Sequence, residues 1–381
     1  MRRTLYGEDH EAFRKVVREY VEREIMPNRE RFIRDGAISR EAWLAAGSQG
    51  LLGLSVPEEY GGGGTTDYRF NAVFDEELTR PGLAYSAAFG VHTHVMSNYL
   101  VRLANDEQRE RWLPGFCSGD IVTAIAMTEP SGGSDLAALT TRATPDGEDW
   151  ILSGAKTFIT NGISADLVVV AARTLPGSRS KGITLLVVEA GMPGFERGRK
   201  LEKVGQREGD TAELFFEEVR VPKENVLGEI NAGFSYMMKH LPTERLASAV
   251  CNLSHARYAL EGTIEYARTR TAFGQAIGSH QHNRFLLADL MTSVDVAQAW
   301  VDCCVESHAL GELSTADASK AKLFTSEVQS RVTDACVQLY GGYGYMTESE
   351  VARAWQDARV TRIWAGTSEI MREVIGRSLG L

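Results

Sequence analysis

DWILSGAKTFITNGISADLVVVAAR, residues 149–173, contains two runs rich in β-branched and apolar residues, and a segment with Gly and Asp separates them. Such runs favour β-strands, and a short polar interruption is typical of a turn. Three further segments have the same character: IVTAIAMT at 121–128, GITLLVVEA at 182–190 and AELFFEEVRVP at 212–222. The sequence therefore predicts a strand domain over residues 121–230.

Helical patterns flank this strand domain on both sides. Apolar residues recur at intervals of three and four from Phe13 to Ile25, and again from Phe324 to Leu339. This spacing places the apolar side chains on one face of a helix. We therefore predict an α+β fold that is mostly α, with a helical domain at 1–120 and a second one at 231–381 that enclose the strand domain.

The order of the elements disfavours the usual dinucleotide-binding folds. Those folds alternate strands with helices to build a parallel sheet, whereas here the strands form one block. No G-x-G-x-x-G follows a predicted strand, and the chain contains no G-x-x-x-x-G-K-[ST].

Composition narrows the class of protein. The 381 residues are 43% hydrophobic and 24% charged, which is typical of a soluble globular protein, and the net charge of -10 disfavours nucleic acid as a partner. Five cysteines without a C-x-x-C pair argue against a disulfide framework or a zinc site. Because we find no readable signal peptide and no apolar run of about 20 residues, we expect a cytoplasmic protein that does not associate with a membrane.

Two histidine pairs, His92-x-His94 and His280-x-His282, have a spacing that metal ligands use. Neither pair has a carboxylate or a cysteine at a convincing offset, so we predict no metal site.

Four motifs contain residues that could carry chemistry, and each also has a simple local explanation. The Gly and Ser residues of MTEPSGGSD, 127–135, could hold a phosphate or a flat ring close to the backbone, but they are also ordinary turn residues. Gly341 is typical of the end of a helix, and Thr367 is typical of a helix N-cap. In HLPTERLASA, 240–249, the local pattern favours a helix that begins near Pro242, with Glu244 in its first turn.

Together these motifs resemble the acyl-CoA dehydrogenase family over essentially the whole chain. The matching segments are LSVPEEYGG (54–62), MTEPSGGSD (127–135), KTFITNG (156–162), RTAFGQAIGSHQ (270–281), QLYGGYGYM (338–346) and RIWAGTSEIMREVIGR (362–377). The resemblance implies a middle β-barrel or sandwich domain and a C-terminal four-helix bundle. It also implies a flavoprotein of fatty acid metabolism (β-oxidation) that binds FAD, oxidises an acyl-CoA to the trans-2-enoyl-CoA, passes electrons to an electron-transfer flavoprotein and forms a homotetramer.

The resemblance also assigns binding residues. Within one subunit, FAD contacts are expected from Ile125, Met127, Thr128, Gly133, Ser134, Phe158, Thr160, Thr367 and Glu369. The FAD of a neighbouring subunit is expected to contact Arg270, Phe273, Gln281, Gln338, Gly341 and Gly342. The acyl-CoA is expected to contact Ser134, Arg245, Ala365 and Gly366, and its acyl chain to lie between helices around 85–100 and 237–247.

One position departs from the common family pattern. Many members carry the catalytic glutamate immediately before the Gly-Thr of the last motif, where this chain has Ala365. The long-chain and isovaleryl branches supply the glutamate from an earlier helix, in a motif like LPTERL at 241–246. Glu244 matches that position, so we predict that Glu244 is the catalytic base and that burial raises its pKa. The backbone N–H of Ala365 would still hold the thioester carbonyl.

The substrate and the electron acceptor stay open at this stage. The motifs favour medium or long straight acyl chains. A flavin-dependent oxidase or monooxygenase on the same scaffold is one alternative. A catalytically silent subunit that binds FAD or CoA is another, suggested by Ala365.

Overall fold

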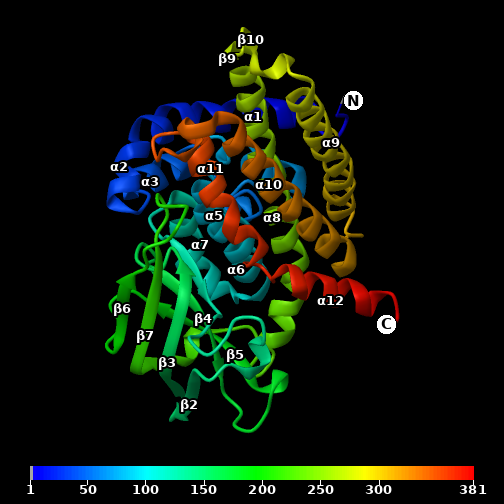
Figure 1. The fold of residues 1–381 in the computed structure, drawn as a ribbon. Helices are drawn as coiled ribbons and strands as arrows, with labels where there is room; N and C mark the ends of the chain where they lie inside the picture. The colour runs from blue at the N-terminus through cyan, green and yellow to red at the C-terminus, as the bar shows by residue number, and fades with distance from the viewer. Residues whose placement is uncertain (1–2) are drawn as a thin grey trace.

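The computed structural model describes residues 3–381 and shows helices, then a sheet, then helices (Figure 1). The N-terminal helices are α1 (Glu8–Tyr20), α2 (Arg29–Asp35), α3 (Arg40–Ser48), α4 (Tyr68–Leu78), α5 (Leu83–Gly90), α6 (Ser97–Leu103) and α7 (Asp106–Ser118). A π-helical turn, Val91–Met96, joins α5 to α6. The α+β class and the order of the three blocks agree with the prediction from sequence.

The strands form one mixed sheet. They are β1 (Thr123–Ala126), β2 (Arg142–Asp146), β3 (Asp149–Thr160), β4 (Leu167–Arg173), β5 (Ile183–Glu189), β6 (Phe195–Lys200), β7 (Thr211–Val221) and β8 (Val226–Leu227). Their order is β6-β7-β3-β2-β4-β5-β8, and β1 pairs in parallel with β4. β3 pairs antiparallel with β7, and β4 pairs antiparallel with β5.

The β4 strand shows why the end of the stretch 149–173 is apolar without alternation. Val168 and Val170 lie on one face of the sheet, where they pack with Leu152 of β3 in a core made by the strands. Val169 packs on the other face of the sheet, in a core that includes Trp112 of α7. Because side chains alternate between the faces of a strand, a strand that is covered on both faces needs apolar residues at every position. The sheet is thereby joined to the N-terminal helices.

Long helices make up most of the C-terminal part. They are α8 (Gly233–Thr269), α9 (Gln281–Ala309), α10 (Thr315–Tyr340), α11 (Glu350–Ala358) and α12 (Ser368–Ser378), with a small hairpin of β9 (Thr271–Ala272) and β10 (Gln275–Ala276). Leu253, Val301 and Val332 bring α8, α9 and α10 together in one apolar core. The hairpin lies at the end of the molecule opposite the sheet (Figure 1).

The structure confirms two predicted helix boundaries, the helix end at Gly341 and the helix start at Thr367. Helix α10 ends at Tyr340, and Gly341 follows it with a φ of 61°, a conformation that glycine adopts without strain. Thr367 is the N-cap of α12, and its hydroxyl accepts a hydrogen bond from the backbone N–H of Ile370.

The local prediction for Pro242 was wrong. Helix α8 begins at Gly233, so Pro242 lies inside the helix and Glu244 lies well beyond its first turn. A proline inside a helix costs about 3 kcal/mol or more. Burial of Met237 in the core shared with the sheet holds the turns that precede the proline. Tertiary packing therefore outweighs the preference that the proline expresses in isolation.

Within residues 3–381, no helix is long and apolar enough to cross a lipid bilayer.

Candidate functional site

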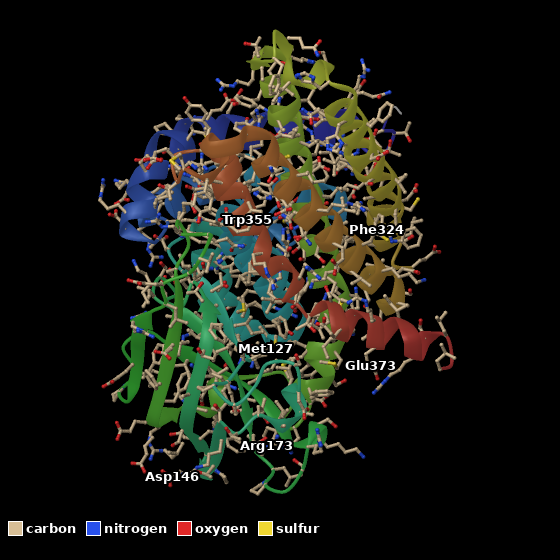
Figure 2. All side chains as sticks on the ribbon, viewed as in Figure 1. Met127, Asp146, Arg173, Phe324, Trp355 and Glu373 are labelled. Carbon is tan, nitrogen blue, oxygen red and sulfur yellow. The ribbon has the colours of Figure 1, made fainter. Side chains whose placement is uncertain are left out.

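A cavity of about 290 Å³ lies where the sheet meets the helical body. Its wall comes from α4 and α5 with the π-helical turn, from β1 and the loop after it, from the end of β3, from α8 and from the turn at 364–366. Met127, one of the lining residues, lies at this junction, whereas Asp146 lies at the far end of the sheet (Figure 2). Segments that are distant in sequence thus share one cavity.

Most of the predicted site residues within one subunit line this cavity. The predicted FAD contacts that line it are Ile125, Met127, Thr128, Gly133, Phe158 and Thr160. The predicted catalytic and thioester-binding residues that line it are Glu244, Ala365 and Gly366. Segments around 85–100 and 237–247, predicted to wall the acyl chain, also contribute residues.

The Glu244 side chain reaches the cavity from α8. Its Oε1 atom is shielded from solvent and has no hydrogen-bond partner among the described residues. Burial raises the pKa of Glu244 from 4.5 to about 7, and the adjacent Arg245 guanidinium opposes that increase. The carboxylate also helps burial to keep the pKa of Tyr99 well above its ordinary value. A carboxylate that lacks partners and titrates near neutrality is suited to accept a proton.

The turn at Ala365 and Gly366 lines the same cavity as Glu244. Ala365 and Gly366 have φ angles of 50° and 90°, both in the left-handed region, which is unusual for alanine. The buried ammonium of Lys322 donates a hydrogen bond of 2.6 Å to the carbonyl of Gly366. The backbone N–H of Ala365 makes no hydrogen bond within residues 3–381. The hydrogen bond from Lys322 therefore fixes the turn, and the backbone N–H of Ala365 is available to a ligand.

Arg245 lies behind the same turn and does not line the cavity. Its Nη1 atom donates to Ser319 Oγ over 3.2 Å, and its side chain is buried. A Cβ atom on Gly366 would lie 3.9 Å from Arg245 Nη2. The Arg245 guanidinium therefore lies next to the turn, and its predicted contact with acyl-CoA stays a prediction.

The wall made by the strands has a feature that its sequence alone does not show. The register between β3 and β7 shifts between Lys156 and Ile159, and Phe158 at this irregularity has a φ of 59° and is 68% exposed. The buried Lys156 ammonium donates to the Met127 carbonyl over 3.1 Å and to Glu129 Oε1 over 2.8 Å. This buried ion pair fastens the loop after β1 to β3, so that Met127 and Phe158 share one wall.

The residues present fit a flavin. Ile125, Met127 and Phe158 offer an apolar surface for a flat ring, and Thr128 and Thr160 add hydroxyl groups beside it. The indole N–H of Trp364, another lining residue, is buried and has no partner in the part of the chain that the structure describes. An unpaired buried donor of this kind is available to an acceptor atom of a bound group.

Besides Arg245, three predicted contacts within one subunit lie outside the cavity wall. Ser134 is exposed in the loop next to Gly133. Thr367 and the exposed Glu369 occupy the start of α12, where Thr367 serves as the cap. Their contacts with FAD stay predictions.

The residues predicted to reach a neighbouring subunit gather elsewhere. Arg270, Phe273, Gln281, Gln338, Gly341 and Gly342 are all exposed. Phe273 is 97% exposed at the tip of the β9–β10 hairpin, and the Arg270 guanidinium lies 5.9 Å from the ring centre of Tyr343. None of the six lines the cavity of its own chain as described. Their predicted contact with the FAD of a neighbouring subunit stays a prediction.

Sequence reasoning missed several residues of the site. Ser248 and Cys251 follow Glu244 by four and seven positions on α8, so helical spacing could have placed them on the same face. His94 was examined only as a metal ligand, and Lys322 carried no local signal. Within the described range, no cluster of His, Cys, Asp or Glu has an arrangement that could hold a metal ion.

Comparison with known proteins places the chain in a family. Acyl-CoA dehydrogenase domain models match in order: the N-terminal domain at 7–120, the middle domain at 124–219 and the C-terminal domain at 231–380. The chain is 43% identical to the mitochondrial long-chain specific acyl-CoA dehydrogenase of Sus scrofa, covering 99% of this chain and 88% of that protein.

Solved structures agree with this assignment. The crystal structure of an acyl-CoA dehydrogenase from Geobacillus kaustophilus superposes with a TM-score of 0.97 at 42% identity, covering 99% of both chains. A glutaryl-CoA dehydrogenase from Mycobacterium smegmatis in complex with FADH2 gives 0.92 at 27% identity, covering 98% of this chain and 95% of the other. The chain therefore belongs to the acyl-CoA dehydrogenase family, FAD-dependent oxidoreductases that dehydrogenate acyl-CoA at a CH–CH bond.

Proposed function

We propose that this chain oxidises medium- or long-chain acyl-CoA thioesters with Glu244 as the catalytic base. The observation that carries the proposal is the position of Glu244, which lines the same cavity as the turn at Ala365 with a raised pKa and an unpartnered carboxylate oxygen. Similarity to long-chain specific relatives supports the preference for chain length.

The chain's own residues bind, orient and deprotonate the substrate. The backbone N–H of Ala365 binds the thioester carbonyl, and Lys322 keeps the turn in place through the Gly366 carbonyl. Glu244 removes the proton from the α-carbon, which the bound carbonyl makes more acidic. The apolar walls exclude water, so that the carboxylate is not stabilised by hydration. Ile125, Met127 and Phe158 would hold FAD, which would supply the acceptor for the hydride from the β-carbon.

Anaerobic titration tests this function and its silent-subunit alternative together. Purified protein with FAD is mixed with acyl-CoAs of increasing chain length, and the loss of flavin absorbance is recorded. We expect bleaching that is fastest with medium or long chains. Absence of bleaching with every chain length would support the silent subunit, because a bound flavin would then receive no electrons.

We also propose a homotetramer that passes electrons to an electron-transfer flavoprotein in the cytoplasm. The exposed set around Arg270 and Phe273 supports assembly, because these residues lie away from the cavity of their own chain. The five cysteines are free, which supports a reducing compartment.

Light scattering tests the tetramer. Reduction of a purified electron-transfer flavoprotein by the protein and acyl-CoA tests the acceptor. Rapid reoxidation of the reduced flavin by air would favour the oxidase alternative instead.

A further inference from the structure

Polar side chains line the part of the cavity that is distant from Glu244. An unsubstituted acyl chain in that part would form hydrogen bonds with none of them. Along α8, Ser248 and Cys251 follow Glu244 on the side that lines the cavity. At 1.5 Å per residue, Cys251 lies about 10 Å along the helix from Glu244. Ser86 lies near the Cys251 thiol, whereas Tyr99 lies near Glu244. The segment from Ser86 to Tyr99 therefore runs antiparallel to this part of α8, and the cavity extends between the two.

Asp75 and His94 form the centre of this polar end, and both line the cavity. Asn71 Nδ2 lies 2.8 Å from His94 Nδ1, and His94 Nε2 lies 2.7 Å from Asp75 Oδ1. The amide of Asn71 can only donate to Nδ1, so the neutral ring donates from Nε2 to Asp75. Asp75 and His94 are 0% and 2% exposed. This chain of hydrogen bonds orients the carboxylate of Asp75 at the cavity wall.

Two polar atoms at this end lack a strong hydrogen-bond partner. Ser248 Oγ is shielded from solvent and makes no hydrogen bond within the described range. Asp75 Oδ2 is shielded as well, and apart from His94 the donor beside this carboxyl group is the weakly donating thiol of Cys251. A buried polar group that stays unpaired costs about 1–3 kcal/mol. Burial is the main reason why the pKa of Asp75 is raised above its ordinary value. The rest of this wall is apolar, with Ala87, Val91 and Val95 among its residues. A purely aliphatic chain would leave Ser248 Oγ unsatisfied and would leave Asp75 Oδ2 with no donor stronger than the Cys251 thiol.

We propose that this polar end is a subsite for a hydroxyl group carried by the acyl chain, at a position distant from the thioester. A hydroxyl donates one hydrogen bond and accepts others. It can therefore donate to Asp75 Oδ2 and accept from the rotatable hydroxyl of Ser248. A carboxylate at the same position would be repelled by Asp75, and a methyl group would pair with neither atom. The inference rests on the proposed function in that it places an acyl chain along α8.

Binding of thioether analogues tests the subsite without turnover. Octyl-CoA thioether lacks the carbonyl that makes the α-proton acidic, so the holoenzyme binds it but cannot dehydrogenate it. Calorimetry compares its Kd with those of analogues that carry one hydroxyl group, moved stepwise along the outer half of the chain, and with the analogue that ends in a carboxylate. We expect one hydroxylated analogue to bind about tenfold more tightly than octyl-CoA, corresponding to about 1.4 kcal/mol. The carboxylate is expected to bind more weakly than either.

Variants identify the groups responsible. Ser248→Ala and Asp75→Ala are each expected to reduce the tenfold preference to about one, because alanine offers the hydroxyl neither a donor nor an acceptor; asparagine at position 75 is avoided because its amide could donate to the hydroxyl oxygen. Val91→Ala is the matched control, because it alters an apolar part of the same wall and should keep the preference. The proposal is overturned if no hydroxylated analogue binds more tightly than octyl-CoA, or if the preference survives both polar variants. Failure of every analogue to bind would instead refute the acyl-CoA site itself, together with this subsite.

Discussion

Replacing Glu244 by Gln is expected to stop flavin reduction and, at the same time, to stabilise the folded protein at alkaline pH. Gln is close in shape to Glu and carries no charge. The pKa of the buried carboxyl group is raised from 4.5 to about 7. At about 1.4 kcal/mol for each pKa unit, ionised Glu244 destabilises the native state by about 3 kcal/mol.

The pH dependence follows from the direction of the shift. The folded state holds this proton more tightly than the unfolded state, so the carboxyl group costs nothing below about pH 4.5, where both states are protonated. The penalty grows as pH rises and is complete above about pH 7. We therefore expect Glu244→Gln to be about 2–3 kcal/mol more stable relative to the wild type at pH 8 than at pH 5.

Urea unfolding at the two pH values measures this difference, with protein and FAD at the same fixed concentrations. Glu261→Gln is the control, because Glu261 is exposed on the same helix and is solvated in both states. Anaerobic mixing with octanoyl-CoA measures flavin reduction, which we expect to slow by at least ~10²-fold in the Glu244 variant. A stability difference that is the same at both pH values, or flavin reduction at nearly the wild-type rate, would refute the reasoning.

Three further predictions concern the pH dependence of kcat/KM, the turn at Ala365 and Gly366, and the contact of Arg270 with the FAD of a neighbouring subunit. In the wild type, kcat/KM is expected to rise as pH increases through about 7, because the base must be ionised in the free enzyme; a flat profile would contradict this. Lys322→Met should lower kcat by about 10- to 100-fold with a smaller change in KM, and Lys322→Arg should recover part of it, because the ammonium positions the Gly366 carbonyl. If Lys322→Met has the kcat and KM of the wild type, Lys322 does not position the turn. Arg270→Ala should lose FAD on dialysis, and an unchanged ratio of flavin to protein absorbance would argue against its contact with a neighbouring cofactor.

Local sequence signals predicted the features that depend on neighbouring residues. The β-branched run in LVVVAAR indicated a strand, and this segment is β4, which the structure covers with apolar cores on both faces. Thr367 and Gly341 were correctly placed at helix ends, because caps depend on the side chain and backbone of a few adjacent residues. The helix start expected near Pro242 was wrong, because burial of the turns before the proline overrides its local preference.

By itself, the sequence determined the order of helices and strands, the family resemblance and the replacement of the usual glutamate by Ala365, which directed attention to Glu244. Only the tertiary structure decided what surrounds that carboxylate. Asp75, His94 and Lys322 come from helices and turns that are far apart in the chain, and no periodicity relates them to Glu244. Burial and hydrogen bonding are set by packing between such segments, so the raised pKa, the anchored turn and the polar end of the cavity exist only once the chain has folded.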